Sequence, residues 1–231
     1  MEATFTQRQN MLKKTLQTLG KQGKTPARET MFPTDVLELI MWTSISDNPF
    51  NPNVKRAFNK LVNEYVDWNE VRVTSSDELG ELLTTCKLEV SRAINIKNSA
   101  QAIFHRENRL CLDFLSPKRP ADIKKYLSEM KNFSDIQIGT IMILIADSDD
   151  VPSTATIRRV AQRIGFALED STDNAVRLIF KKTLQKSQGF NAFYLIGKHA
   201  HTVCKEVGPR CSTCNLNNIC AFGKEKLTPK K

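Results

Sequence analysis

Four of the six cysteines lie within 17 residues, with the spacing C-x6-C-x2-C-x5-C: Cys204, Cys211, Cys214 and Cys220. Two disulfides are one interpretation, although the composition is that of an ordinary intracellular protein and we expect no secretory signal peptide. A zinc site is a second, although such sites usually have two tight cysteine pairs or a Cys/His mixture, and here only the middle pair is tight. An iron–sulfur cube, which takes one sulfur per iron, is a third. The residues alone leave all three open.

The charge is unevenly placed along the sequence. The chain of 231 residues has a net charge of +9, with 40% hydrophobic and 26% charged residues. Residues 1–34 hold six Lys/Arg and two Glu, and residues 181–231 hold ten and two, so the central part is net acidic. If the two ends meet in space, they form a basic lobe, which favours nucleic acid through phosphate contacts. For Lys224–Lys231 alone, a solubilising tail is the alternative.

Apolar residues recur at helical spacing through most of the chain, and no strand pair or repeat is recognisable. Capping residues mark several helix starts, such as Asp35 with Glu38 and Ser75 with Glu78, and Gly165 marks a helix end. Two helices, 121–130 and 138–146, are joined by a turn at 131–137. We therefore predict an all-α fold of about ten helices. No apolar run reaches the length of a membrane span.

Three stretches resemble the endonuclease III family, the iron–sulfur DNA glycosylases of the helix-hairpin-helix (HhH-GPD) superfamily. They are the cysteine loop 204–220, the helix that leads into it at His199–Cys204, and Val151–Val160, which is similar to the family's Val-Asp-Thr-His-Val-x-Arg-Val. The resemblance covers roughly residues 30–222 and also includes the two helices around 131–137. It implies a [4Fe-4S] cluster on the four cysteines rather than zinc.

The resemblance also implies a two-lobed fold. A helical barrel lobe is expected at 35–153, with a degenerate helix-hairpin-helix at about 121–146. A cluster lobe is expected from 1–34 together with 154–231, which would bring the two basic ends together.

The catalytic pattern of the family is broken in this chain. The family's carboxylate position reads Thr154, whose neutral hydroxyl cannot balance a cationic sugar or act as a strong base. Its lysine position, which supplies the nucleophile of bifunctional members, reads Gly139. The two hairpin glycines become Asp135 and Gln137, which weakens the contact of backbone N–H groups with phosphate. A shifted loop that presents Asp150 as the carboxylate is the alternative.

We therefore expect a protein that recognises damaged or distorted double-stranded DNA without standard glycosylase and lyase chemistry. One alternative is an active glycosylase that uses Asp150, and another is a redox-sensing or scaffolding iron–sulfur protein. We further expect a monomer inside the cell, in the cytoplasm, nucleoid or nucleus, with no membrane partner. The expected DNA contacts are Ile136, Gln137, Ile138, Gly139, Thr140, Arg158, Lys205 and Arg210.

Overall fold

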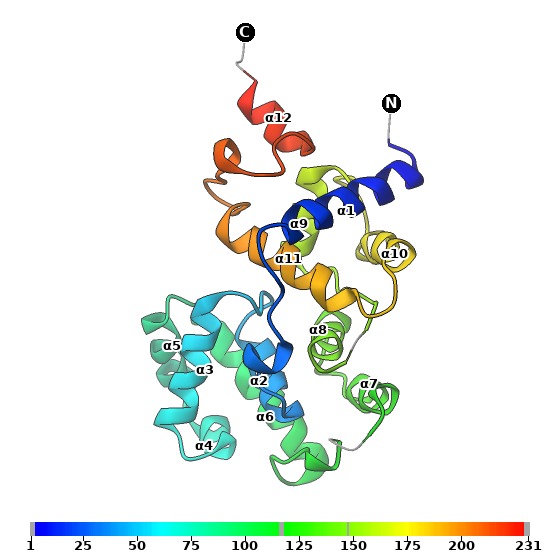
Figure 1. Ribbon diagram of the computed structural model, residues 1–231. Coiled ribbons are helices and arrows are strands. Elements are labelled where there is room, and N and C mark those ends of the chain that lie inside the picture. The colour runs from blue at the N-terminus through cyan, green and yellow to red at the C-terminus, as the bar shows by residue number, and fades with distance from the viewer. Residues whose placement is uncertain (1–2, 116–117, 147, 229–231) are drawn as a thin grey trace. The chain divides into compact units, whose positions relative to one another are not determined.

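The structure is a computed structural model and describes residues 3–115, 118–146 and 148–228. Within these ranges it contains twelve α-helices, three short 3-10 helices and no strand, so the predicted all-α fold is confirmed (Figure 1). No helix in the described ranges is both long and apolar enough to cross a membrane. The chain divides into two compact units, one formed by Met1–Ala27 with Asp147–Lys231 and the other by Arg28–Ala146. The lobe boundaries expected at 34/35 and 153/154 stay a prediction.

The unit formed by Arg28–Ala146 is built around one buried helix, α2 (Val36–Ile45). Every residue of α2 except Glu38 is buried, and α2 packs against α3, α6 and α8. The helix begins as predicted at Asp35, whose carboxylate accepts a hydrogen bond from the Glu38 backbone N–H at 2.9 Å. The other helices of this unit are α3 (Pro52–Glu64), α4 (Trp68–Val73), α5 (Ser76–Thr85), α6 (Arg92–Glu107), α7 (Pro120–Glu129) and α8 (Asp135–Ile145).

The predicted pair of helices around 131–137 is present, with a different start for the second one. Helix α8 begins at Asp135 rather than at Ile138, because the Ser134 hydroxyl accepts a hydrogen bond from the Gln137 N–H at 3.1 Å and caps the helix there. Helices α7 and α8 pack against each other, and Phe133 in the turn between them is buried. The turn is therefore short, and the predicted hairpin residues belong to the first turns of α8.

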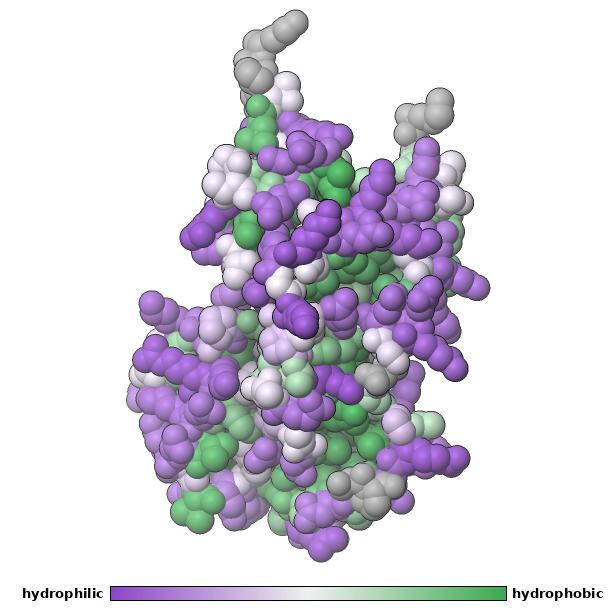
Figure 2. All heavy atoms as spheres, in the orientation of Figure 1, coloured by the Kyte–Doolittle hydropathy of each residue, from purple (hydrophilic) through white to green (hydrophobic). Residues whose placement is uncertain are grey.

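The unit formed by Met1–Ala27 with Asp147–Lys231 contains both ends of the chain. Its central element is α11 (Gly189–Thr202), which packs against α1 (Phe5–Gly20) and α9 (Ala155–Ile164). The unit also contains α10 (Asp173–Thr183) and α12 (Ala221–Leu227), which pack against α1 and α9 respectively. Its residues hold 19 Lys/Arg and nine Asp/Glu, so it carries the basic excess of the chain. Figure 2 shows hydrophilic side chains over much of the visible surface.

Two helices in the unit formed by Arg28–Ala146 differ from the sequence prediction. The sequence predicts a connector at 66–72, but Trp68–Val73 form α4, which Asp67 caps through the N–H groups of Asn69 and Glu70. The spacing of apolar residues predicts a helix at 88–104, and the corresponding helix α6 begins later, at Arg92. Lys87 has a left-handed φ of 60°, and the chain turns there before α6 begins. Both differences arise from local capping and backbone geometry.

Candidate metal centre and nucleic-acid interface

The four cysteines of the predicted cluster loop line one small pocket. The pocket also includes Ile164 of α9, His199 of α11 and Phe222 of α12, together with Leu216 from the cysteine loop itself. All six cysteines of the chain are free thiols in this structure, so the disulfide interpretation is not what the structure contains. The structure therefore brings together all four residues that the spacing singled out.

The donor set can be compared with what a single ion or a cluster requires. Within the described residues, no three His, Cys, Asp or Glu side chains are grouped closely enough to hold one metal ion. A single zinc ion binds sulfur at about 2.3 Å, so its ligands converge on one point. A four-iron cluster takes one sulfur at each iron and so accepts sulfurs that are further apart. In the described residues the four cysteines line one pocket but do not form a group close enough to hold a single ion.

Backbone N–H groups point at two of the sulfurs. The Leu216 N–H donates to Cys214 Sγ at 3.4 Å, and the Gly223 N–H donates to Cys220 Sγ at 3.3 Å. Burial raises the pKa of both thiols, and these N–H groups lower it only in part. Metal binds the thiolate form, which these N–H groups favour and burial disfavours.

Two arginines of α9 donate hydrogen bonds to the backbone of the loop that begins at Cys204 and ends at Cys211. Arg163 donates to the carbonyl oxygens of Lys205 at 2.6 Å and Glu206 at 3.0 Å, and its Nη1 lies 3.7 Å from Cys204 Sγ. Arg159 donates to the Cys204 carbonyl oxygen at 3.2 Å. Neither arginine was singled out from the sequence, although their spacing of four places them on one face of a helix. The loop is thus held from α9 through its backbone carbonyl groups.

The two cations expected to contact DNA are exposed on this fastened loop. Lys205 and Arg210 both have exposed side chains, and the Arg210 N–H donates to the Val203 carbonyl oxygen at 3.0 Å. Gly208 lies between them with φ of 64°, a left-handed conformation that glycine adopts without strain. The loop therefore presents its cations on an ordered backbone.

The predicted contacts at the hairpin differ in their exposure. Ile138 and Thr140 are 3% and 4% exposed, so their side chains face the core. Gln137 is half-buried, and its carboxamide donates to Thr43 Oγ1 at 3.3 Å and Ser44 Oγ at 3.1 Å on α2. Ile136 and Gly139 are also half-buried. The accessible side chains of α8 are thus those of its first turn and of Ile145 at its end, and DNA contact at the first turn stays a prediction.

Thr154 has a structural task. Its hydroxyl accepts a hydrogen bond from the Ile157 N–H at 3.2 Å and caps α9, and the residue is 2% exposed. The sequence predicts a helix from Ser153 to Ile164, and the helix begins two residues later, at Ala155. A buried hydroxyl occupied as a helix cap has neither the charge nor the freedom of a catalytic carboxylate.

The nearby charged residues are paired. Asp150 accepts hydrogen bonds from two guanidinium nitrogens of Arg177, one of them at 3.0 Å. Arg158 forms an ion pair with Asp173 at 2.5 Å, and Ser153 donates to the same carboxylate at 3.0 Å. Before they could act on DNA, Asp150 would have to break its ion pair with Arg177, and Arg158 its ion pair with Asp173.

Comparisons with known proteins agree with the fold. No protein-family model matches the chain. It is 22% identical over 192 residues to the Arabidopsis thaliana protein named "Putative DNA glycosylase At3g47830", covering 82% of this chain and 63% of that protein's length. It is also 22% identical over 190 residues to endonuclease III of Sulfolobus acidocaldarius, covering 81% of this chain and 82% of the relative.

Solved structures share the whole fold. A trapped covalent endonuclease III–DNA intermediate with an estranged adenine aligns over 98% of this chain and all of its own, with a TM-score of 0.71 and 15% identity. A non-covalent endonuclease III–DNA complex aligns with a TM-score of 0.70, 16% identity and coverage of 97% and 99%. A thermostable thymine-DNA glycosylase aligns with a TM-score of 0.59, 15% identity and coverage of 94% and 97%. The chain therefore has an endonuclease III-like fold.

Proposed function

We propose that this protein binds damaged or distorted double-stranded DNA, carries a [4Fe-4S] cluster, and lacks the standard glycosylase and lyase chemistry of the fold. The observation that carries the proposal is Thr154, because the residue matched to the family's carboxylate is a buried hydroxyl that already caps α9. The residue matched to the family's lysine is Gly139, which offers no amine. Charge stabilisation and the nucleophile are thus both missing.

The basic residues support the DNA-binding part of the proposal. The unit formed by both chain ends holds 19 basic and nine acidic residues, and Lys205 and Arg210 lie exposed on the fastened cysteine loop. Phosphate contacts from such residues position a protein on duplex DNA without reading its sequence. These residues therefore support binding to duplex DNA that does not depend on its sequence.

The cluster would be held by Cys204, Cys211, Cys214 and Cys220. When bound, it would tie the ends of the loop together and supply a one-electron redox centre. The protein residues around it donate hydrogen bonds to two sulfurs and keep the loop in place through Arg159 and Arg163. Their role in the proposal is to orient the ligands and the exposed cations.

The cluster is tested by the metal content of the purified protein. We expect about four irons per chain and a broad visible absorption, with both lost in the Cys211→Ser variant. One equivalent of zinc and no visible absorption in protein purified without air would contradict the cluster. Replacement of Cys86, which lies outside the loop, by serine is the control and should leave the iron content unchanged.

Catalysis is tested on duplexes with an abasic site or a damaged base. We expect no borohydride-trapped covalent adduct, because Gly139 has no amine, and little or no release of the base. Robust base release by the wild-type protein would contradict the proposal. If Asp150→Asn then abolished that release, a glycosylase with a relocated carboxylate would replace it. Failure to bind any duplex in the same experiment would favour a redox or scaffolding protein.

A further inference from the structure

Three exposed valines lie on one short stretch of the unit formed by Arg28–Ala146, from the last turn of α3 to the end of α4. Val62, Val66 and Val73 are 48%, 92% and 62% exposed. Single exposed apolar residues are normal, whereas a group that charged residues surround marks an interaction site. Figure 2 shows apolar side chains at the surface in the region of α3 and α4, at the lower left of the view. We call these three residues the valine surface.

Hydrogen bonds hold the backbone and the side chains around the valine surface in place. The Val66 N–H donates to the Glu70 carboxylate at 2.6 Å, which ties the turn after α3 to α4. Glu70 and Val73 are three residues apart on α4, so their side chains share one face of the helix. Tyr65 is half-buried, and its hydroxyl donates to Glu78 on α5 at 3.3 Å. The turn that carries Val66 is therefore joined to both of the helices that follow it.

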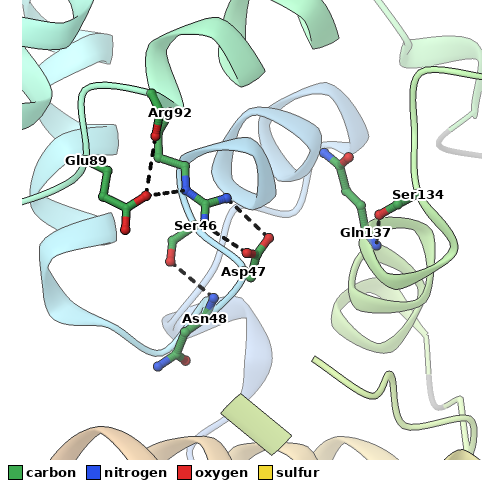
Figure 3. A network of polar contacts seen from close by, with 8 residues as sticks. Ser46, Asp47, Asn48, Glu89, Arg92, Ser134 and Gln137 are labelled. Carbon is green, nitrogen blue, oxygen red and sulfur yellow. Dashed lines mark hydrogen bonds and ion pairs between the residues drawn. The ribbon is translucent and has the colours of Figure 1, made fainter. Parts of the chain in front are cut away.

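The stretch that carries the valine surface is strongly acidic. Residues 61–86 contain six Asp/Glu and one Arg, in a chain whose net charge is +9. Of these six carboxylates, only Glu64 has an ion pair in the part of the chain that the structure describes, with Lys60 at 3.4 Å. The other five are exposed: Asp67, Glu70, Asp77, Glu78 and Glu81. By contrast, Asp47 and Glu89, which lie outside this stretch, both pair with Arg92 (Figure 3).

Several of these carboxylates gather around Tyr65, next to the most exposed valine. Burial raises the pKa of the Tyr65 hydroxyl, and the carboxylates of Glu78, Glu64 and Glu70 raise it further. Salt screens the interaction of exposed charges that are far apart, so carboxylates with this effect lie close to the ring. The valine surface is therefore bordered by negative charge that the described part of the chain leaves largely without cations.

The negative charge determines which kind of partner fits the valine surface. Nucleic acid and anionic membrane surfaces are themselves negative, so these carboxylates repel them. A second copy of this chain has the same net charge of +9, which opposes association between copies. A protein segment with both basic and apolar side chains complements the carboxylates and the valines together.

We propose that the valine surface binds a basic segment of another protein that also carries apolar side chains. The apolar side chains of that segment cover the valines, and its lysines or arginines face the carboxylates that have no ion pair. Tyr65 and Trp68, both half-buried beside Val66, are of the residue types that contribute most to protein interfaces. Burial of the valines supplies affinity, and the carboxylates select a basic partner. This interaction goes beyond the proposed function and does not require DNA.

The test uses three labelled synthetic peptides of equal length. One is built from lysine and leucine, one from lysine and serine, and one from glutamate and leucine. Fluorescence anisotropy with the full-length protein, in the absence of DNA, measures the Kd of each peptide. We expect the wild type to bind the Lys/Leu peptide at least about tenfold more tightly than either of the others, because only this peptide offers both kinds of side chain. The affinity should fall as salt rises.

Two variants with matched controls separate the apolar and the charged parts of the contact. Val66→Ser should weaken binding of the Lys/Leu peptide about tenfold. Val207→Ser removes a valine that is 87% exposed in the other unit and should keep the wild-type Kd. Asp77→Asn/Glu81→Gln should weaken binding about threefold and reduce its salt dependence. Its control, Glu169→Gln/Asp170→Asn, neutralises the same residue types at exposed positions of the other unit.

Equal affinity of the wild type for the three peptides would overturn the proposal, as would Lys/Leu binding that both variants leave unchanged. Sedimentation velocity examines the other occupants. Self-association of the wild type that Val66→Ser abolishes would replace the proposal with contact between copies, and a tenfold loss of duplex binding in Val66→Ser would replace it with DNA. Failure of the wild type to bind any duplex would contradict the proposed function alone, because the peptides are measured without DNA.

Discussion

At the scale of single residues, Thr154 caps a helix at the position where the related family has its carboxylate. Its hydroxyl caps α9 by accepting the Ile157 N–H, and the residue is buried. Loss of an N-cap side chain costs about 1 kcal/mol, because a backbone donor at the helix start is left without a partner. The position is therefore constrained by the stability of α9, whatever chemistry the protein performs.

We expect Thr154→Ala to lower the free energy of unfolding by about 1 kcal/mol, measured by chemical denaturation. Thr154→Ser, which keeps the hydroxyl, should retain most of the wild-type stability. Thr156→Ala, in the same helix but without a capping role, is the control and should be neutral, because alanine favours helix interiors. Unchanged stability in Thr154→Ala would show that the cap contributes little.

Sequence patterns predicted which residues gather at the candidate metal centre, but they could not predict where individual side chains point. The cysteine spacing pointed to four side chains that line one pocket in the structure. The inward turn of Gln137 could not be predicted, because its partners Thr43 and Ser44 are more than ninety residues away in the sequence. The fastening of the loop by Arg159 and Arg163 depends on the packing of α9 beside it, which spacing alone does not give.

At the scale of elements, α11 approaches the segment after α8 too closely for any residue but glycine at its first position. A Cβ at Gly189 would lie 1.9 Å from the Ser148 carbonyl oxygen and 3.1 Å from the Asp149 Cα. These are backbone atoms, so a side-chain rotation cannot relieve the clash. The start of α11 and residues 148–149 are therefore held in one arrangement.

Gly189→Ala should destabilise the protein by about 1–3 kcal/mol, since the backbone must shift to make room. Helix propensity alone predicts the opposite sign, a gain of up to about 1 kcal/mol. Gly20→Ala, at the end of α1, is the control, because its nearest contact would be at 4.0 Å. Thermal denaturation of both variants distinguishes the two predictions. A melting temperature of Gly189→Ala at or above that of the wild type would contradict this packing.

Helices with strong local patterns were predictable, and those defined by a single cap were not. Asp35 and Ser75 cap their helices as the sequence predicts, and Gly165 ends α9 with a φ of 102°. The six residues of α4 are too few to show a periodic apolar face, so the cap at Asp67 was the only local indication. The late start of α6 follows from a positive φ at Lys87, which lysine rarely adopts.

At the scale of the whole molecule, the excess of basic residues lies in one of the two units. The unit that contains both chain ends has 19 Lys/Arg against nine Asp/Glu, which leaves 15 against 16 for residues 28–146. A protein that neutralises phosphates releases counterions, so its affinity for DNA falls as salt rises. The division of charge predicts that the unit with both termini supplies most of this salt-dependent binding.

The charge reversal Lys205→Glu/Arg210→Glu tests that prediction. Because α9 already holds the backbone of this loop, its cations meet phosphate with little further ordering, and each contact should contribute roughly −0.9 to the slope of log K against log salt. Loss of both contacts should make the slope shallower by about 1.8 and weaken binding to every duplex sequence alike. Lys55→Glu/Arg56→Glu changes the same charge at exposed positions of α3 in the other unit and should keep the wild-type slope. Equal losses in the two variants would show that total charge, rather than the cysteine loop, governs the contact with DNA.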